Sequence, residues 1–367
     1  MDNKHIAILG LGLIGGSLAF RFNSKGYHVT GYDVDEERGR AALDLGAIDA
    51  LAGSASEAVV GCDFIFVATP VGVVTDTVEA IMANIENGAV VSDVGSVKRP
   101  IMESITALEP AFAFIGGHPM AGSEQGGIAA ADPNLFENAV YVLTPLPSAS
   151  EGFSRDLTRL RELIEEELGA SVMVMDSAIH DEIVAAVSHM PHVAAAALVN
   201  ALGQAAERAP AALALAAGGF RDTTRVASGS PELWADICLH NKAPVLRSIA
   251  YLQDELEAVQ EALLVHDAQG LEGFFQRARD LRAEVPIAQR SLIPPLFDLM
   301  VPVPDTPGAI SAVTSLLASA NLSLKDIGIV RQREGEVGAL RIGLADEKSC
   351  ALALKILQSE GYRAYRR

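Results

Sequence analysis

The glycines near the start of the chain have the spacing of a loop that binds a dinucleotide. The apolar run at residues 6–9 leads into Gly10-Leu11-Gly12-Leu13-Ile14-Gly15. Gly10 permits a tight turn and Gly12 lets a pyrophosphate approach the backbone, while Gly15 allows a helix to pack closely on the strand. The anion is then expected at the positive end of that helix. We therefore assign cofactor binding to this loop, at Gly10, Gly12, Leu13, Ile14 and Gly15.

Asp33 indicates which dinucleotide the loop binds. It ends the second predicted strand, 18 residues after Gly15. A carboxylate at this place accepts hydrogen bonds from an adenosine ribose and repels a 2′-phosphate, so the pattern predicts NAD rather than NADP. Two alternatives stay open on these residues alone, a glycine-rich turn that binds no nucleotide and a site for FAD.

His118 has the position and the chemistry of a general base. It follows Gly116 and Gly117 at the end of the fifth predicted strand, next to a fourth strand that ends at Asp93. Open α/β sheets bind ligands at the carboxyl ends of their strands, which places His118 on the nicotinamide side. An imidazole with a pKa of about 6.5 takes a proton from a hydroxyl as hydride leaves the same carbon. The alternative is a histidine that only completes a turn.

Two polar clusters follow in an Ala-rich helical part, Ser188-His189-Met190-Pro191-His192 and Gly218-Gly219-Phe220-Arg221-Asp222-Thr223-Thr224-Arg225. Arg221 and Arg225 share a helical face, and a guanidinium is the natural partner of a carboxylate; a surface ion pair is the alternative. The two histidines lack a third ligand at helical spacing, so we predict no metal. Together these residues indicate an NAD-dependent dehydrogenase with a hydroxylated, anionic substrate.

The elements that must position these residues form an α/β fold. Short β-branched runs alternate with helical patterns through the first 145 residues, which predicts βαβ units and a mostly parallel, Rossmann-type sheet. The runs are HIAILG, HVTGYD, FIFVAT, AVVSDV, AFIGG and AVYVLT, and SVMVMD at 171–176 is a further candidate. The rest of the segment from residue 151 is helical in pattern.

An apolar stripe marks the last long helix of this segment. Its members are three or four residues apart and so lie on one helical face: Leu246, Ile249, Leu252, Leu256, Val259 and Leu263. The stripe either packs within its own domain or forms a seam with a second copy of the chain. The sequence leaves both interpretations open.

A chain of 367 residues is too long for one core, because single cores stop growing at roughly 250–300 residues. We predict an NAD-binding domain at 1–150, an all-helical substrate and dimerisation domain at 151–288, and a small α+β domain at 296–367. The proline-rich stretch 286–295 suits an extended linker. The composition also changes there, since residues 1–295 carry a net charge of −20 and residues 296–367 a net charge of +1.

Composition argues against several classes of protein. A net charge of −19 disfavours nucleic acid and anionic membrane as partners. No segment has about 18 uninterrupted apolar residues and the start MDNKHIAILG is not a signal peptide, so we expect no spanning helix and a cytoplasmic protein. Cys62, Cys238 and Cys350 are odd in number and far apart, which is typical of reduced thiols.

The motifs of the chain, taken in order, resemble those of a known family. They are GLGLIGGSLA, ATPV, DVGSVK, HPMAGSE, SHMPH, GGFRDTTRVA and PELW followed by NK, and they run across residues 5–285. In this combination they resemble the prephenate dehydrogenases of tyrosine biosynthesis. The block from Leu296 onward resembles an ACT domain, the small βαββαβ module that senses amino acids.

This resemblance implies NAD-dependent oxidative decarboxylation of prephenate to 4-hydroxyphenylpyruvate. In that reaction His118 accepts the hydroxyl proton, Ser96 forms a hydrogen bond near it, and Arg225 holds a substrate carboxylate. Thr69 of the ATPV motif joins the cofactor site. A polar rim surrounds the substrate side chain, partly contributed by the second subunit of a homodimer: Glu124, His189, His192, Asp222 and Trp234.

Three alternatives accompany this assignment. Arogenate, the transaminated analogue that yields tyrosine directly, is the alternative substrate. A β-hydroxyacid dehydrogenase is expected to use a lysine in its helical domain, and the paired SHMPH and GGFRDTTR motifs argue against it. A catalytically silent amino-acid sensor is disfavoured because both His118 and Arg225 are present.

The resemblance to an ACT domain implies L-tyrosine as a feedback inhibitor. In the turn at 305–309, Pro307 sets the chain direction and Gly308 opens the backbone just before a predicted helix. Free amides and the positive end of that helix are then available to a carboxylate. We expect tyrosine to bind near Asp305, Gly308 and Asn321, and the alternative is a loop-to-helix turn without a ligand.

Overall fold

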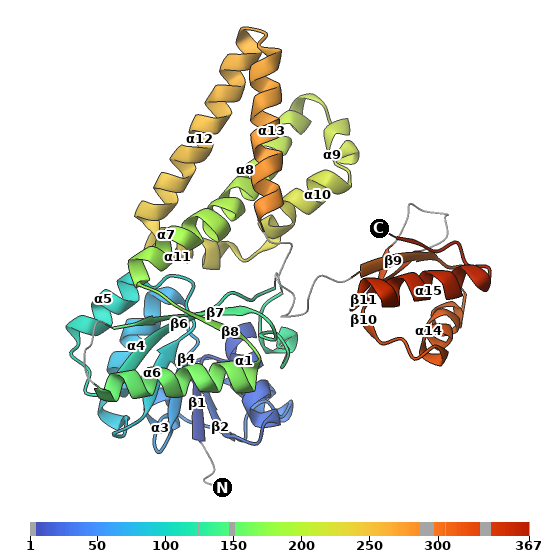
Figure 1. The fold of residues 1–367 in the computed structure, drawn as a ribbon. Coiled ribbons are helices and arrows are strands. Elements are labelled where there is room, and N and C mark those ends of the chain that lie inside the picture. The colour runs from blue at the N-terminus through green and yellow to red at the C-terminus, as the bar shows by residue number, and fades with distance from the viewer. Residues whose placement is uncertain are drawn as a thin grey trace. The chain divides into compact units, whose positions relative to one another are not determined.

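The structure is a computed structural model that describes residues 5–123, 125–146, 151–285, 297–304, 306–330 and 339–366. The chain divides into two compact units, Met1–Ala288 and Gln289–Arg367 (Figure 1). Each unit has hydrophobic core clusters of its own.

The first unit is built on a sheet of eight strands in the order β3-β2-β1-β4-β5-β6-β7-β8. All neighbouring pairs are parallel except β6 and β7, which confirms the mostly parallel, Rossmann-type sheet. The strand order reverses between β1 and β4, and open sheets bind ligands at such a switch point. The strands are β1 (His5–Leu9), β2 (His28–Tyr32), β3 (Ala50–Leu51), β4 (Phe64–Val67), β5 (Val90–Asp93), β6 (Ala113–Pro119), β7 (Val140–Pro145) and β8 (Ser171–Val174).

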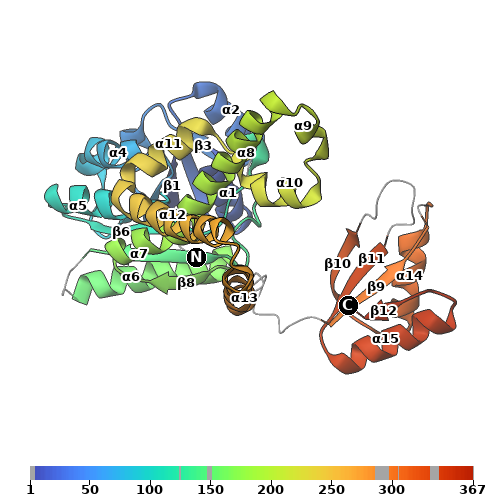
Figure 2. The ribbon, with the colours of Figure 1, turned by 90° about the horizontal axis from the view of Figure 1, so that it is seen from above.

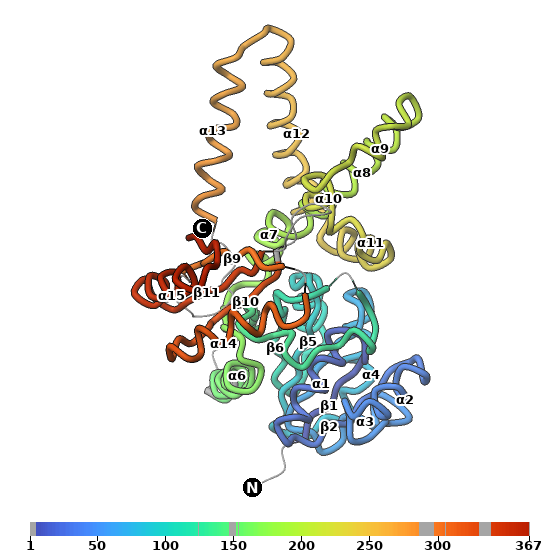
Figure 3. Tube along the Cα trace, turned by 90° about the vertical axis from the view of Figure 1, so that its right-hand side faces the viewer, coloured from blue at the N-terminus to red at the C-terminus, as the bar shows by residue number. Residues whose placement is uncertain are grey.

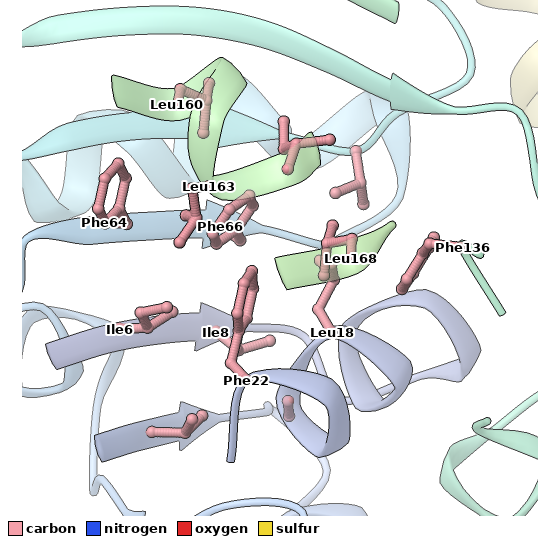
Figure 4. Close-up of a cluster of buried hydrophobic side chains, with 14 of the residues drawn as sticks. Ile6, Ile8, Leu18, Phe22, Phe64, Phe66, Phe136, Leu160, Leu163 and Leu168 are labelled. Carbon is pink, nitrogen blue, oxygen red and sulfur yellow. The ribbon is translucent and has the colours of Figure 1, made fainter. Parts of the chain in front are cut away.

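Helices cover both faces of this sheet because its buried strands are apolar on both sides. Along β1, Ile6 and Ile8 belong to one core cluster, whereas Ala7 and Leu9 belong to the other. The first cluster includes Phe22, Leu18 and Leu163 (Figure 4). Its helices are α1 (Leu13–Ser24), α2 (Glu36–Asp44) and α6 (Glu151–Leu163), and those of the second are α3 (Ala55–Ala58), α4 (Val74–Ile81) and α5 (Arg99–Ala107). Short 3₁₀ turns occupy Val71–Val73, Met82–Asn84 and Ile128–Ala130, and a π turn at Ile164–Leu168 extends α6.

The sheet continues beyond residue 150. Leu160 and Leu163 of α6 are buried in the first core cluster, and β8 pairs in parallel with β7. We therefore propose that the first domain ends near residue 175 rather than at 150.

The helical part that follows ends in a hairpin of two long helices, α12 and α13, which projects away from the sheet (Figures 1 and 3). In the view from above, α13 is seen nearly end-on (Figure 2). Leu246, Leu256 and Leu263 of the apolar stripe are 56%, 53% and 57% exposed, so the stripe does not pack within its own domain at these positions. The helices are α7 (Ser177–Val184), α8 (Met190–Arg208), α9 (Ala211–Leu215), α10 (Gly218–Thr224), α11 (Pro231–His240), α12 (Lys242–Leu264) and α13 (Ala268–Glu284), with a π turn at Ala185–His189 and a 3₁₀ turn at Arg225–Ser228.

The continuous helical run Ser177–Arg208, formed by α7, the π turn and α8, is long and apolar enough to cross a membrane by length and composition alone. By that criterion it departs from the expectation of no spanning helix. A core helix passes the same test. Four polar side chains of this run make contacts in the site described below. His180 and Asp181 bond to His118 and Arg99 of the first domain, whereas His189 and His192 contact Asn241 and Trp234. We therefore interpret the run as the central helix of the site.

The second unit is a four-stranded antiparallel sheet in the order β10-β11-β9-β12, with two helices. Leu299, Val313 and Leu357 are among the side chains of its core. The elements follow the order βαββαβ, which confirms the predicted ACT-type fold. They are β9 (Phe297–Pro302), α14 (Ala309–Ser319), β10 (Leu324–Val330), β11 (Ala339–Leu344), α15 (Glu347–Ser359) and β12 (Tyr365–Arg366).

Candidate active site

The glycine loop after β1 has the geometry that a pyrophosphate requires. Gly10 has a φ of +98°, and a Cβ there would lie 2.5 Å from the carbonyl oxygen of Ala68. A Cβ on Gly15 would lie 1.9 Å from the carbonyl oxygen of Gly10, whereas one on Gly12 would meet nothing within 4 Å. Among the described residues no side chain caps the start of α1 at Leu13. Open space beside Gly12 and uncapped helix amides therefore fit an anionic group.

Asp33 and Thr69 lie on either side of this loop. The Asp33 carboxylate accepts the amide of Leu11 at 2.7 Å and that of Asp35 at 2.9 Å, and Arg38 Nη1 lies 3.3 Å from both of its oxygens. The Thr69 backbone nitrogen lies 3.2 Å from a Cβ built on Gly10. Thr69 Oγ1 is buried and has no hydrogen-bond partner in the part of the chain that the structure describes. Both residues therefore adjoin the place where a dinucleotide is expected.

His118 lies near the end of β6 and is held by a chain of two further side chains. Its Nδ1 is 2.8 Å from His180 Nε2, and His180 Nδ1 is 2.7 Å from Asp181 Oδ1. All three residues are buried, with His180 and Asp181 1% and 2% exposed. His180 and Asp181 were not among the residues predicted from the sequence. The signal that could have found them is an imidazole directly followed by a carboxylate on a helix that is largely apolar on the sides next to them.

The carboxylate of Asp181 also joins α7 to the first domain. It accepts the amide of Lys98 at 2.8 Å and that of Arg99 at 2.9 Å, where α5 begins. Lys98 is fully buried, pairs with Asp93 and donates to the carbonyl of Gly117 at 2.8 Å. The DVGSVK motif thus supports the backbone on which His118 sits. Ser96, predicted to act near His118, lies half-buried in the same loop.

Burial keeps the imidazoles of His118 and His189 neutral at pH 7. Burial is the main cause that lowers the pKa of His118 well below its ordinary value, and His180, Lys98 and His189 lower it further. Burial likewise lowers the pKa of His189 to about 4, against an opposing contribution from Asp181. A neutral imidazole has one nitrogen lone pair, so His118 is in the state that accepts a proton.

His189, His192 and Trp234, which the resemblance assigns to one rim, lie next to one another, and their contact with substrate stays a prediction. The His192 ring stacks on Trp234 with centroids 3.6 Å apart, and the His189 ring meets Trp234 edge-on at 6.2 Å. Asn241 Nδ2 donates to the carbonyl of Asp181 at 2.8 Å and lies 3.1 Å from His189 Nδ1. Because Nδ1 accepts this bond, His189 carries its proton on Nε2, a buried atom without a partner among the described residues. It is a donor available to a ligand.

The other predicted residues are placed differently. Asp222 in α10 and Arg225 just after it are exposed, and their contact with substrate stays a prediction. Glu124 and Asp305 lie outside the described residues. In the second unit, Gly308 is the N-terminal cap of α14 with a φ of +88°, and Asn321, just after α14, has a φ of +56°. Within the described residues no group of three or more His, Cys, Asp and Glu side chains is arranged to hold a metal.

Three features at one edge of the sheet define a dehydrogenase of the Rossmann class. They are the dinucleotide loop, the carboxylate at the end of β2 and the buried histidine. Two family models match the chain, "Prephenate dehydrogenase, nucleotide-binding domain" over residues 17–174 and "Prephenate dehydrogenase, dimerization domain" over residues 176–277. The chain therefore belongs to the prephenate dehydrogenase family, as its motifs predicted.

Individual relatives agree with this assignment. The prephenate dehydrogenase of Bacillus subtilis (strain 168) is 38% identical over 346 residues, 93% of this chain and 92% of that protein. The cyclohexadienyl dehydrogenase of Zymomonas mobilis subsp. mobilis is 32% identical over 290 residues, 76% of this chain and 95% of that protein. A crystal structure of prephenate dehydrogenase from A. aeolicus, in complex with hydroxyphenyl propionate and NAD+, has a TM-score of 0.71 at 29% identity and covers 78% of this chain and 99% of that one.

Proposed function

We propose that the chain catalyses the NAD-dependent oxidative decarboxylation of prephenate to 4-hydroxyphenylpyruvate. The observation that carries this proposal is a buried, neutral His118 at the carboxyl edge of the sheet that also bears the glycine loop. Family membership supplies the reaction class, and the histidine supplies the base that the class requires.

The reaction removes a hydride from one end of a ring and CO2 from the other, while the hydroxyl proton moves to a base and back. When bound, NAD accepts the hydride from the carbinol carbon. His118 takes the hydroxyl proton, so that a carbonyl forms at that carbon. The bond to the ring carboxylate then breaks, CO2 leaves, and the electron pair of that bond moves through the ring to the carbonyl oxygen, which takes the proton back from His118 and becomes the phenol hydroxyl. The ring becomes aromatic, which makes the step strongly favourable.

NAD is the dinucleotide that the site favours over NADP. Asp33 is held against the loop by the amide of Leu11, so its negative charge stays where a 2′-phosphate would come. The related A. aeolicus enzyme was solved with NAD+. Arg38 offsets part of the Asp33 charge, and we therefore expect a finite preference rather than an absolute one.

Prephenate is proposed as the preferred substrate over arogenate, because a relative 38% identical to this chain is a prephenate dehydrogenase. His189 and His192 are neutral at pH 7 because burial lowers both pKa values, and Trp234 carries no charge. These three side chains offer no carboxylate to the ammonium group of arogenate, whereas the two other predicted members of the rim, Glu124 and Asp222, would. Arogenate remains the second candidate, because a relative 32% identical to this chain is a cyclohexadienyl dehydrogenase.

A homodimer is the proposed assembly. Three of the six side chains in the apolar stripe of α12 are exposed in one copy and the other three are half-buried, and a dimerization-domain model matches residues 176–277. Arg225, exposed in the same region, is then proposed to hold a substrate carboxylate in a pocket that a second subunit completes. A cytoplasmic location stays a prediction of the sequence.

L-tyrosine is the proposed inhibitor, bound by the second unit near Gly308 and Asn321. The support is the βαββαβ order of that unit and the left-handed cap of α14. A truncation after Val285, assayed with and without tyrosine, tests this proposal. Retained activity with lost inhibition supports it, whereas unchanged inhibition would place tyrosine in the active site as a product analogue.

The assay for the main proposal is the growth of NADH absorbance when the full chain and NAD are mixed with prephenate, arogenate or a β-hydroxyacid. We expect turnover with prephenate and much less with arogenate. Higher kcat/KM with arogenate would reverse the substrate assignment. No turnover with any of the three would favour a catalytically silent sensor.

A further inference from the structure

We propose that His180 and Asp181 are positioning residues that fix which ring nitrogen of His118 is free to take the substrate proton. This inference rests on the proposed role of His118 as the base. Neither residue came from the sequence motifs, and both are almost fully buried.

The hydrogen-bond donors around Asp181 determine which nitrogen of His180 is protonated. The Asp181 carboxylate accepts the backbone N–H groups of Lys98 and Arg99 at the start of α5, one on each oxygen. A carboxylate can bond only to a nitrogen that carries a proton. His180 Nδ1, 2.7 Å from Asp181 Oδ1, is therefore the protonated nitrogen of that ring.

The protonation of His180 in turn determines which nitrogen of His118 is protonated. With its proton on Nδ1, a neutral His180 has its lone pair on Nε2, which accepts a hydrogen bond. His118 Nδ1 lies 2.8 Å from that atom and must be the donor. The neutral His118 ring then has its lone pair on Nε2, the nitrogen that faces away from His180. Two residues behind the base thus select the tautomer that can accept a proton.

The groups around His118 also affect the positive charge that this imidazole gains when it takes the substrate proton. Lys98 from the start of α5, His180 from α7 and His189 from the π turn all face His118. The ammonium group of Lys98 opposes a positive imidazole there, whereas His180 and His189 would oppose it only when they are themselves protonated. Lys98 is itself paired with Asp93. Asp181 is hydrogen-bonded to His180, which is hydrogen-bonded to His118. Its negative charge therefore offsets the positive charge that His118 gains.

The first arm of the test compares two variants of His180. His180→Leu removes the acceptor for His118 Nδ1, and we expect kcat to fall at least about 10²-fold with little change in KM for prephenate, because His180 is 1% exposed. His180→Gln keeps an oxygen that accepts from His118 and an amide that donates to Asp181. We expect it to restore most of the lost kcat. His5→Leu, at the opposite end of the sheet, is the matched control and should keep wild-type turnover.

The second arm reads the tautomer directly, by ¹⁵N chemical shifts of the histidine side chains in the full-length protein. The wild type should show His118 protonated on Nδ1 and not on Nε2 at neutral pH, and His180→Leu should shift the proton toward Nε2. This arm stands even where His180→Leu folds poorly, because the wild-type spectrum alone decides it.

His118→Asn separates failure of this inference from failure of the proposed function. Loss of turnover in His118→Asn together with unchanged kcat in His180→Leu would overturn the positioning role and leave the base intact. Full turnover in His118→Asn would refute the base, and the wild-type spectrum would still report the tautomer. A wild-type His118 protonated on Nε2 overturns the inference in either case.

Discussion

Removing one partner of the buried pair of Asp93 and Lys98 should be strongly destabilising for the first unit, because it leaves an unpaired charge in the interior. Both side chains are 0% exposed, and Lys98 additionally donates to the carbonyl of Gly117, next to His118. Asp93→Asn removes the charge partner and leaves the ammonium group of Lys98 in the interior. Breaking one partner of a buried pair typically costs about 3–5 kcal/mol. That corresponds to a factor of roughly 10² to 10⁴ in the unfolding equilibrium constant.

The assay is urea denaturation followed by the fluorescence of Trp234, the single tryptophan of the chain, which lies in the first unit. Glu36→Gln is the matched control, because the Glu36 and Arg40 pair is 79% and 70% exposed and such surface pairs contribute little. Adding Lys98→Met to Asp93→Asn should recover part of the loss, since it removes the unpaired charge. A loss below about 1 kcal/mol in Asp93→Asn, equal to that of the control, would refute this reasoning.

Three further predictions concern pH, cofactor and substrate. The pKa of His189 is about 4 in the fold and about 6.5 in the unfolded chain, so between these pH values the unfolded state binds more protons. The free energy of unfolding should therefore fall as the pH drops from about 6.5 to 4. Urea denaturation curves across that range check this, and a constant free energy of unfolding would contradict it. Asp33→Ser should narrow the preference for NAD over NADP measured as kcat/KM, and equal efficiency of the wild type with both would count against the assignment. Arg225→Ala should raise KM for prephenate, since losing a desolvated charge partner costs on the order of 2–5 kcal/mol; an unchanged KM would remove Arg225 from the carboxylate site.

Local patterns were sufficient to predict most of the first sheet. The runs that became β1, β4 and β5 are short, apolar on both faces and bounded by turn residues, which is typical of buried parallel strands. β3 has only two residues and gives no such pattern. The antiparallel direction of β7 depends on how its chain returns to β6, which periodicity does not encode.

The cofactor part of the site could be predicted because it, too, depends on a local sequence pattern. The glycine loop and Asp33 belong to one βαβ unit, so their spacing along the chain sets their spacing in the fold. His118 and His180 are 62 residues apart and meet only because α7 docks on the start of α5. The sequence shows each side chain but not this docking, and the chain of hydrogen bonds behind the base was therefore missed.

The most direct test of the account is the turnover of His118→Asn with prephenate and NAD, followed by NADH absorbance, beside a separate measurement of NAD affinity. We predict that kcat falls roughly 10²–10⁴-fold, the range expected for a positioned general base, while NAD binding stays at the wild-type level. A variant that keeps more than about half of the wild-type turnover would contradict the role of His118 in the reaction.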